Sequence, residues 1–460
     1  MLHDKYCKKD TNPIYPAFCE SYPEAPLPKY ELPPDPIPAA AAARLIRDEL
    51  MDEGNARLNL ATFCQTFMEK DATDLMSETL AKNSIDKSEY PRTAELENRC
   101  VNIIARLWHT SESENFIGTS TEGSSEACML CGLAMKFRWK KRTPDWRTRT
   151  PNLVISSGYQ VCWEKFCRYW DVELRAIPMS RRCRRLPVQK ALEACDANTI
   201  GIVGILGITY TGEYDEIALL DAEVSKYNQT SATPIFIHVD AASGGFFAPF
   251  VEPELVWDFR LKNVVSINAS GHKYGLVYPG VGWAIWRDRQ FLPEELIFRV
   301  SYLGGSVETM ALNFSRSASQ IIGQYYNFLR FGRSGYERIH RNTLRAAAYV
   351  ADRLDEMGRF DLLNRGERLP VLCFTQKETS ARWSLYDLSD RLRMRGWLVP
   401  TYPLPPSLEE CVVQRFVFRA DFGAHLAEEL TEDIARAVEE LDSAAVGSRV
   451  KKNLRYGFTH

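Results

Sequence analysis

Five short apolar segments between residues 152 and 268, separated by amphipathic stretches, constrain the fold of this chain more than any other feature of its sequence. Apolar strands that alternate with helical stretches are typical of βα units, which build a largely parallel sheet. In such sheets, ligands bind at the carboxyl ends of the strands. We therefore expect an α/β domain whose strands are "NLVIS" (152–156), "VELRAIP" (172–178), "IGIVGILGI" (200–208), "IFIHV" (235–239) and "NVVSIN" (263–268).

The regions on either side of these strands differ in composition. The proline-rich stretch at 22–38 cannot form a helix or a central strand, so it predicts an extended arm before a helix that begins near Pro38. Beyond about residue 330, two helical patterns and two apolar strands indicate a smaller α+β domain. The predicted parts are an arm and helical segment (1–60), a large domain (61–330), a small domain (331–445) and a tail (446–460).

Composition and charge exclude several classes of function. The formal net charge of −3 gives no general attraction to nucleic acid. No apolar run approaches the roughly 20 residues that a membrane span needs, and the charged first residues lack an apolar core, which predicts a cytoplasmic protein. Cys128 and Cys131 form a CxxC pair, but no second pair or nearby histidine completes a zinc site, so no metal is expected.

A lysine follows the last predicted strand, in "SINASGHKYG" (266–275), between two glycines. A lone lysine there is most often a loop residue whose amine reaches solvent. Two other features end at the same predicted sheet edge. Ser124 and Ser125 follow Gly123 at the start of an amphipathic helix, where free N–H groups hold a phosphate or a serine simply caps the helix. Asp240 directly follows the strand "IFIHV", where it either pairs with a ligand or caps a turn.

Together these residues supply what pyridoxal phosphate needs. The helix start holds the phosphate, with Ser270 and His272 beside it, and the Lys273 amine condenses with the aldehyde. The Asp240 carboxylate keeps the pyridine nitrogen protonated, because an opposite charge nearby raises the pKa of that nitrogen. Gln160, which follows another strand and a glycine, lies over the ring or is an ordinary loop residue.

Several long motifs, in order, extend this interpretation over residues 38 to about 440. With them the chain resembles the pyridoxal-phosphate-dependent group II decarboxylases, and among these the glutamate decarboxylases. The resemblance implies the fold type I, aminotransferase-like architecture and a homodimer or a homohexamer built from dimers, with active sites at the dimer interface. The motifs include "GNARLNLATFCQTF", "IDKSEYP", "GSSEACML", "HVDAASGGFFAPFV" and "SINASGHKYGLVYPGVGW".

The resemblance also implies a role for each site residue. Lys273 is the lysine that binds the cofactor, Asp240 the partner of the pyridine nitrogen and Gln160 the side chain stacked on the ring. The other implied residues contact the phosphate (Ser124, Ser125, Ser270 and His272), line the ring (Thr209 and Ala242), take a substrate carboxylate (Arg419) or surround the distal carboxylate (Thr62, Phe63, Asn83 and Asp86).

The implied reaction is the α-decarboxylation of L-glutamate to 4-aminobutanoate (GABA) and CO2. A decarboxylase of aspartate, cysteine sulfinate or another acidic amino acid is the nearest alternative, because one methylene changes binding in a pocket by only about 1–3 kcal/mol. A non-catalytic scaffold that binds pyridoxal phosphate is a second alternative.

Two parts of the chain depart from the pattern of relatives. Glu122 puts a carboxylate near the predicted phosphate site, and the loop at 179–196 is unlike the usual sequence. The tail at 446–460 ends in His460, which partly matches a histidine that enters the active site near neutral pH in bacterial-type relatives. Plant-type relatives end in a tryptophan-containing calmodulin target. Because this tail has no tryptophan, we favour a tail whose histidine enters and blocks the active site over one that binds calmodulin.

Overall fold

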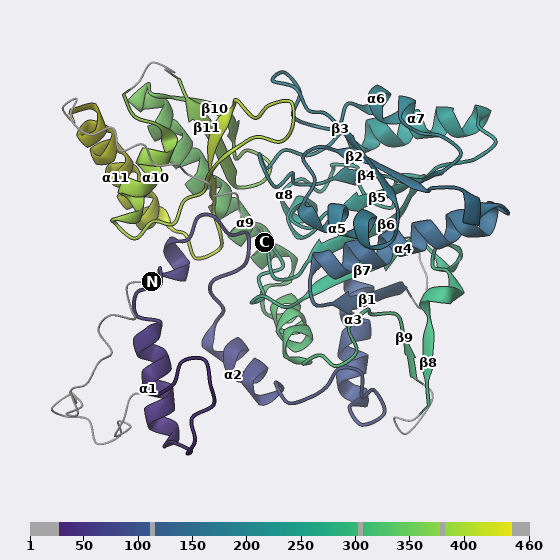
Figure 1. Ribbon diagram of the computed structural model, residues 1–460, viewed down its shortest axis with the longest axis horizontal. Helices are drawn as coiled ribbons and strands as arrows, with labels where there is room; N and C mark the ends of the chain where they lie inside the picture. Colours follow the sequence, from purple (N-terminus) through teal and green to yellow (C-terminus); the bar gives the residue numbers. More distant parts are fainter. Residues whose placement is uncertain (1–26, 111–115, 302–306, 378–381, 444–460) are drawn as a thin grey trace. The chain divides into compact units, whose positions relative to one another are not determined.

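The computed structural model describes residues 27–110, 116–301, 307–377 and 382–443, and the chain divides into two compact units, residues 1–55 and 56–460 (Figure 1). The first unit contains helix α1 (Ala39–Glu49), which follows Pro38 as expected from the proline-rich stretch. Lys29 pairs with Glu49 across 3.2 Å within this unit. Everything described below belongs to the second unit.

A seven-stranded sheet dominates the second unit, with the strand order β1-β7-β6-β5-β4-β2-β3. Strands β2 to β6 pair in parallel, whereas β7 runs antiparallel to both of its neighbours. The strands are β1 (Ile117–Thr121), β2 (Asn152–Ser156), β3 (Glu173–Ile177), β4 (Thr199–Ile205), β5 (Ile237–Asp240), β6 (Val264–Ser270) and β7 (Gly282–Trp286).

All five predicted strands are present, with differences at their ends. The segment predicted at 200–208 ends as a strand at Ile205, and the chain then turns through Gly207, whose φ of 111° favours glycine. Strand β5 extends to Asp240, so that residue is the last of the strand rather than the first of the loop. Strands β1 and β7 were not predicted, because "IGTST" and "GWAIW" lack the β-branched apolar pattern of the others.

The two faces of the sheet are covered by different helices, because successive side chains of a strand point to opposite faces. Val154 of β2 packs into the core on one face, while Leu153 and Ile155 pack into the core on the other. The first face is covered by α3 (Pro91–Leu107), α6 (Val188–Glu193), α7 (Ile217–Thr230), α8 (Ala248–Val251) and the beginning of α9 (Ser319–Met357). The second face is covered by α4 (Ser124–Arg142) and α5 (Val161–Tyr169).

A smaller antiparallel sheet follows, with the order β10-β11-β13-β12. It packs with the last turns of α9 and with two later helices around a separate core. Helix α9 is interrupted at Gly332, whose φ of 53° favours glycine, and this break lies beside the domain boundary predicted near residue 330. The elements are β10 (Phe360–Arg365), β11 (Val371–Gln376), β12 (Thr401–Pro403), β13 (Val412–Val417), α10 (Leu385–Arg393) and α11 (Ala424–Ser443).

The remaining described elements are peripheral to both sheets. Helix α2 (Lys70–Glu78) packs against α9, and a two-stranded sheet pairs β8 (Phe298–Val300) with β9 (Val307–Thr309). Across the described residues, no helix combines the length and the apolar character that a bilayer crossing requires.

Candidate active site

A cavity of ≈ 500 Å³ lies where β4, β5 and β6 end and α4 begins. Its lining includes all nine residues that the sequence assigned to a cofactor, although they come from five separate parts of the chain. These residues are Ser124, Ser125, Gln160, Thr209, Asp240, Ala242, Ser270, His272 and Lys273. The cavity is therefore at the carboxyl edge of the parallel strands, where sheets of this type bind ligands.

The anion side of the cavity is the start of α4. Ser124 is the first residue of this 19-residue helix, and its hydroxyl lies 2.7 Å from the hydroxyl of Ser270 at the end of β6. A Cβ added to Gly123 would lie 2.9 Å from Cε1 of His272, so the glycine lets the imidazole approach the helix end. Free N–H groups and a positive helix end at this point suit a phosphate.

His272 is a neutral donor in this arrangement. Burial, together with the nearby Lys273, lowers the pKa of the His272 imidazole to about 4. The Val281 N–H donates to its Nδ1 over 3.3 Å, so the proton of the neutral ring is on Nε2.

The carboxylate of Asp240 is buried and held by three donors. Trp163 Nε1 donates to Oδ2 over 2.8 Å, while Ala242 N and Asn268 Nδ2 donate to Oδ1 over 3.1 and 3.2 Å. These donors hold the carboxylate in one orientation. Asp240 also lines the cavity.

Lys273 lines the same cavity. Its amine donates to Ser243 Oγ over 3.3 Å and lies 5.1 Å from the ring centre of Phe63. Burial lowers the pKa of the Lys273 amine, and the charge of Asp240 opposes that effect. A lowered pKa increases the fraction of the neutral amine, which is the nucleophilic form.

The donor set of this cavity fits pyridoxal phosphate. The start of α4, where Gly123 has no side chain, can accept a phosphate. The buried Asp240 carboxylate can accept a ring N–H, and Lys273, whose pKa is lowered, is in the same cavity. The sides of the cavity carry small or capping residues. Gln160 caps α5, because its Oε1 accepts from the Cys162 N–H over 2.6 Å, and the Thr209 carbonyl accepts from the guanidinium of Arg415.

Comparison with known proteins identifies the family. Residues 41–377 match the conserved domain of the pyridoxal-dependent decarboxylases. The chain belongs to the pyridoxal-dependent decarboxylases. The cofactor of this decarboxylase is accordingly pyridoxal 5'-phosphate, as the residues of the cavity predicted.

Relatives of this decarboxylase match it from end to end. It is 57% identical to a glutamate decarboxylase of Lactococcus lactis subsp. cremoris and 57% identical to glutamate decarboxylase beta of Listeria monocytogenes, with 100% of both chains covered in each case. A solved structure of Lactobacillus brevis glutamate decarboxylase superposes with a TM-score of 0.89 at 60% identity, over 92% of this chain and 97% of that one. A sphingosine-1-phosphate lyase of Burkholderia pseudomallei superposes with a TM-score of 0.76 at 20% identity, which shows the shared fold.

These comparisons confirm the predicted architecture. The decarboxylase has the large, mostly parallel sheet and the smaller antiparallel sheet that the resemblance implied.

The residues predicted to bind substrate fall into two groups in this decarboxylase. Phe63 is buried against the amine of Lys273, and Thr62 is its neighbour. Asn83 and Asp86 lie elsewhere: neither is among the described residues that line the Lys273 cavity. Asn83 Oδ1 accepts from the N–H of Arg316, and the Asp86 N–H donates to the Asn83 carbonyl.

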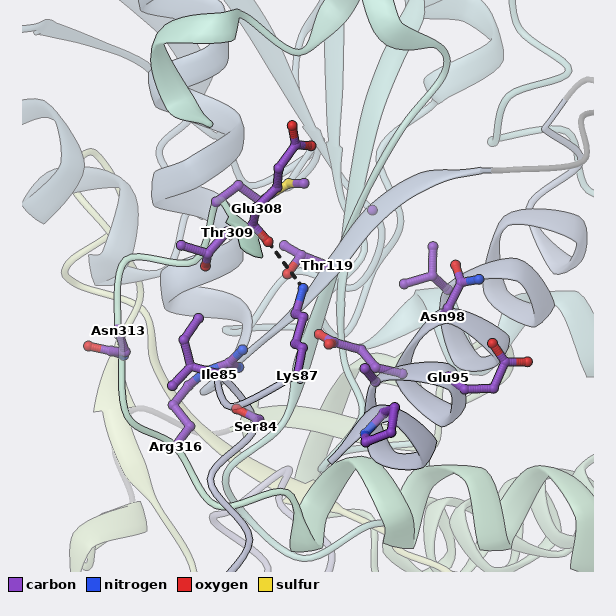
Figure 2. A pocket seen from close by; sticks show the side chains of 16 residues that line it. Ser84, Ile85, Lys87, Glu95, Asn98, Thr119, Glu308, Thr309, Asn313 and Arg316 are labelled. Carbon is purple, nitrogen blue, oxygen red and sulfur yellow. Dashed lines mark hydrogen bonds between the residues drawn. The ribbon is translucent and has the colours of Figure 1, made fainter. Parts of the chain in front are cut away.

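The sequence neighbours of Asn83 and Asp86 line a second cavity of ≈ 450 Å³, shown in Figure 2. Ser84, Ile85 and Lys87 line it, and the Lys87 amine donates to the Glu308 carbonyl over 3.2 Å. Asn313 lines both cavities, so the two are neighbours across the segment that follows β9.

Arg419 occupies a different environment from the one that its predicted role requires. Its guanidinium is buried, with an exposed fraction of 1%. It donates five hydrogen bonds to the segment that carries Thr62 and Phe63, to the carbonyls of Ala56, Arg57, Asn59 and Thr62 and to Thr66 Oγ1. These bonds fasten that segment to the end of β13.

Two residues near the cavity were missed in the sequence. Arg415, four residues before Arg419, lies 4.8 Å from the Phe63 ring, and its Nε has no hydrogen-bond partner among the described residues. Glu126 accepts from the N–H groups of Leu312 and Asn313 over 2.7 and 3.1 Å, and so holds that segment over the start of α4. An acidic residue in the first turn of a helix was the available signal for Glu126; nothing in the sequence separated Arg415 from Arg419.

The two departures from the pattern of relatives have different outcomes. Glu122 is exposed, and its N–H donates to the Glu126 carboxylate over 2.7 Å. The loop at 179–196 is held by ion pairs, which include Arg184 with Glu213 at 2.9 Å. His460 lies outside the described residues.

Proposed function

We propose that this protein catalyses the α-decarboxylation of L-glutamate to 4-aminobutanoate and CO2. The observation that carries the proposal is end-to-end identity of 57% with proteins named glutamate decarboxylase, in a chain whose Lys273 and Asp240 share one cavity. A decarboxylase of aspartate or cysteine sulfinate remains the alternative, because a single methylene separates these substrates in a pocket.

We propose that the nine cavity residues hold pyridoxal phosphate in the roles that the sequence predicted. When bound, the cofactor supplies an aldehyde that reacts with amines and a conjugated ring that accepts the electron pair left by CO2. Ser124, Ser125, Ser270 and His272 take the phosphate. Asp240 accepts the ring N–H and is oriented for it by Trp163, Asn268 and Ala242.

The chain itself contributes orientation and proton transfer. Gln160, Thr209 and Ala242 line the sides of the cavity and would limit how a bound ring can lie there, which would orient the substrate for cleavage of its α-carboxylate bond. Lys273 Nζ would deliver the proton that replaces CO2 on the α-carbon, because its amine lies in the cavity that would hold the substrate.

We assign the substrate carboxylate to Arg415 rather than to Arg419. A guanidinium that binds substrate needs a donor to spare. Arg415 donates to the carbonyls of Thr209 and Ala61, and its buried Nε has no hydrogen-bond partner among the described residues. Arg415 also contacts the same Phe63 ring as the Lys273 amine does. Arg419 positions the segment around Thr62, because its five hydrogen bonds are already made to that segment.

We propose that Asn83 and Asp86 act in the active site of a second copy of the chain. The resemblance implies a dimer with sites at its interface, and the positions of these two residues outside the Lys273 cavity of their own chain support such an assembly. A homohexamer built from dimers is compatible with the same arrangement.

The test of the proposed function is a comparison of kcat/KM for L-glutamate, L-aspartate and cysteine sulfinate. We expect glutamate to be preferred and the release of 4-aminobutanoate and CO2 in equal amounts. Lys273→Ala should abolish both the visible absorption of the bound cofactor and the release of CO2. A preference for aspartate would overturn the choice of substrate, and a protein that stays colourless with added cofactor would overturn the reaction class.

A further inference from the structure

Two thiols and a carboxylate meet on one wall of the active-site cavity. Cys128 from α4, Cys162 from α5 and Asp240 from β5 are all buried, and their sulfur and oxygen atoms lie within 4.8 Å of one another. Cys128 Sγ is 3.7 Å from Asp240 Oδ2. All three residues line the cavity, so the group is open to small solutes when the cavity is free.

The CxxC pattern pointed to a different pair of thiols. Cys131, the second cysteine of that pattern, has a side-chain hydrogen bond with Ser266. The partner of Cys128 is Cys162, which is far away in the sequence and is brought close by the packing of α4 against α5. The sequence therefore gave no signal for this group.

The spacing of the three residues suits a soft divalent cation. Zinc–sulfur bonds of about 2.3 Å and zinc–oxygen bonds of about 2.0–2.2 Å put the ligand atoms of a tetrahedron roughly 3.6–3.8 Å apart. The distance from Cys128 to Asp240 already has this value, and the widest separation in the group needs to shrink by about 1 Å. The three residues leave a fourth position of the tetrahedron open, which water or another small ligand would complete.

The charges around the group also suit a cation. Burial raises the pKa of the Cys128 thiol well above its ordinary value, so a metal that binds there must displace the proton of this thiol. Two thiolates and one carboxylate around a divalent cation leave one net negative charge. The Lys273 amine, which already interacts with Asp240, Cys128 and Cys162, supplies the opposite charge.

We propose that the cofactor-free chain binds one soft divalent cation of the zinc and cadmium class through Cys128, Cys162 and Asp240, and that this cation and pyridoxal phosphate exclude one another. Exclusion rests on the proposed function, because Asp240 is assigned to the pyridine nitrogen there. The cation is an inhibitor of cofactor loading and plays no part in the decarboxylation.

The test uses the full chain after its cofactor has been removed with hydroxylamine, and cadmium ion as the probe. We expect an ultraviolet absorption band from thiolate-to-cadmium charge transfer that saturates at one cadmium ion per cofactor-free chain. The same titration of the cofactor-loaded protein gives the background that is subtracted. Cys128→Ser and Cys162→Ser should each weaken this binding at least about 100-fold, since even residues that only orient a metal ligand change affinity by about 10–100-fold.

Two matched variants control for the other thiols. Cys131→Ser on α4 and Cys167→Ser on α5 also change buried thiols, but these lie outside the group, so the band should persist in both. Bound cadmium should prevent the return of visible absorption when pyridoxal phosphate is added, and a chelator should restore it.

The outcomes separate this proposal from the proposed function. A band of equal size in loaded and cofactor-free protein, or one that survives both Cys128→Ser and Cys162→Ser, would overturn the metal site. A cofactor-free protein that binds cadmium at this group but never gains visible absorption with pyridoxal phosphate would contradict the proposed function and the exclusion, and leave the cation site standing.

Discussion

A chain of hydrogen bonds leads from Asp240 through the side chains of Asn268, His238 and Ser266, and each of these three donates to the residue before it. His238 is fully buried and its pKa is lowered by burial to about 4, so its imidazole is neutral. Asn268 donates its amide to Asp240, which leaves its Oδ1 to accept from His238 Nε2 over 2.8 Å. His238 Nδ1 then accepts from the Ser266 hydroxyl over 2.8 Å. This single consistent assignment fixes the Asn268 amide and, through it, the carboxylate.

The two arginines near β13 give the first prediction at the level of single residues. Arg415→Lys should raise KM for glutamate about 10–100-fold, because a bidentate charged contact worth roughly 1.5–3 kcal/mol is lost. Arg419→Lys should lower the thermal midpoint of unfolding instead, because it leaves buried carbonyls unpaired at about 1–3 kcal/mol. Steady-state kinetics and thermal unfolding of both variants test this assignment, and the reverse pattern would return the substrate to Arg419.

The sequence predicted that Ser124, Asp240 and Lys273 lie close together, and all three line one cavity. Ser124 begins α4, Asp240 ends β5 and Lys273 follows β6, and parallel strands bring their carboxyl ends to one edge. The sequence did not distinguish the roles of Arg415 and Arg419, because both belong to the segment "RFVFR". Only the packing of residues 56–66 decides which guanidinium has its hydrogen-bond donors occupied by the chain itself. The pairing of Cys128 with Cys162 depends likewise on helix packing.

At the level of elements, strands with strong apolar patterns were predicted and those that depend on tertiary packing were not. Strands β2 to β6 are apolar enough to be recognised alone. Strand β1 contains only one apolar side chain, Ile117, and is a strand because β7 pairs with it from Ile117 to Thr121. Helix α9 begins at Ser319, before the helical pattern expected beyond about residue 330, because the break at Gly332 hides the continuity of its pattern.

A buried carboxylate joins two elements at the edge of the cavity and gives a prediction at this level. Asp215 accepts from the N–H of Leu186 over 2.7 Å and from the N–H of Ile205, the last residue of β4, over 2.8 Å. Burial raises the pKa of the Asp215 carboxyl to about 6. Its contribution to stability is therefore fully present below the unfolded pKa of about 3.8 and is lost as the pH rises through about 6.

Asp215→Asn should remove this pH dependence. As the pH falls from 7.5 to 4.5, the free energy of unfolding of the unsubstituted protein should increase by about 1–3 kcal/mol more than that of the variant does. Denaturant unfolding of both proteins across this range measures the difference. Asp221→Asn is a suitable control, since Asp221 is also a buried carboxylate that accepts from a backbone N–H. A difference between the protein and Asp215→Asn that does not change with pH would contradict the prediction.

At the level of the whole molecule, the tail predicted at 446–460 lies outside the described residues, so its role stays a prediction from the sequence. A histidine with an ordinary pKa of about 6.5 is neutral above that pH and charged below it. If His460 plugs the site when neutral, activity should rise as the pH falls, and removal of 446–460 or His460→Ala should extend activity toward neutral pH. Superimposable pH–activity curves for the full and shortened chains would instead indicate a frayed end.

The shared active site is the last prediction at this level, and it follows from where Asn83 and Asp86 lie. A pair of inactive variants, Lys273→Ala and Asp86→Ala, should restore each other when two differently tagged chains are expressed together and the mixed dimer is purified. In that dimer, one site combines Lys273→Ala with Asp86→Ala and is inactive. The other combines an intact Lys273 with an intact Asp86 from the other chain.

The mixed dimer should therefore have about half the activity of the unsubstituted dimer, because one of its two sites is complete. If Asp86 served the site of its own chain, each site would carry one substitution and the mixed dimer would be inactive. Asp74→Ala is the control for expression and mixing, because Asp74 is an acidic residue on the exposed side of α2 that pairs with Lys70. A mixed dimer of Lys273→Ala and Asp74→Ala should have one intact site whichever chain supplies Asp86. If this control dimer is active and the mixed dimer of Lys273→Ala and Asp86→Ala is not, the shared site is contradicted.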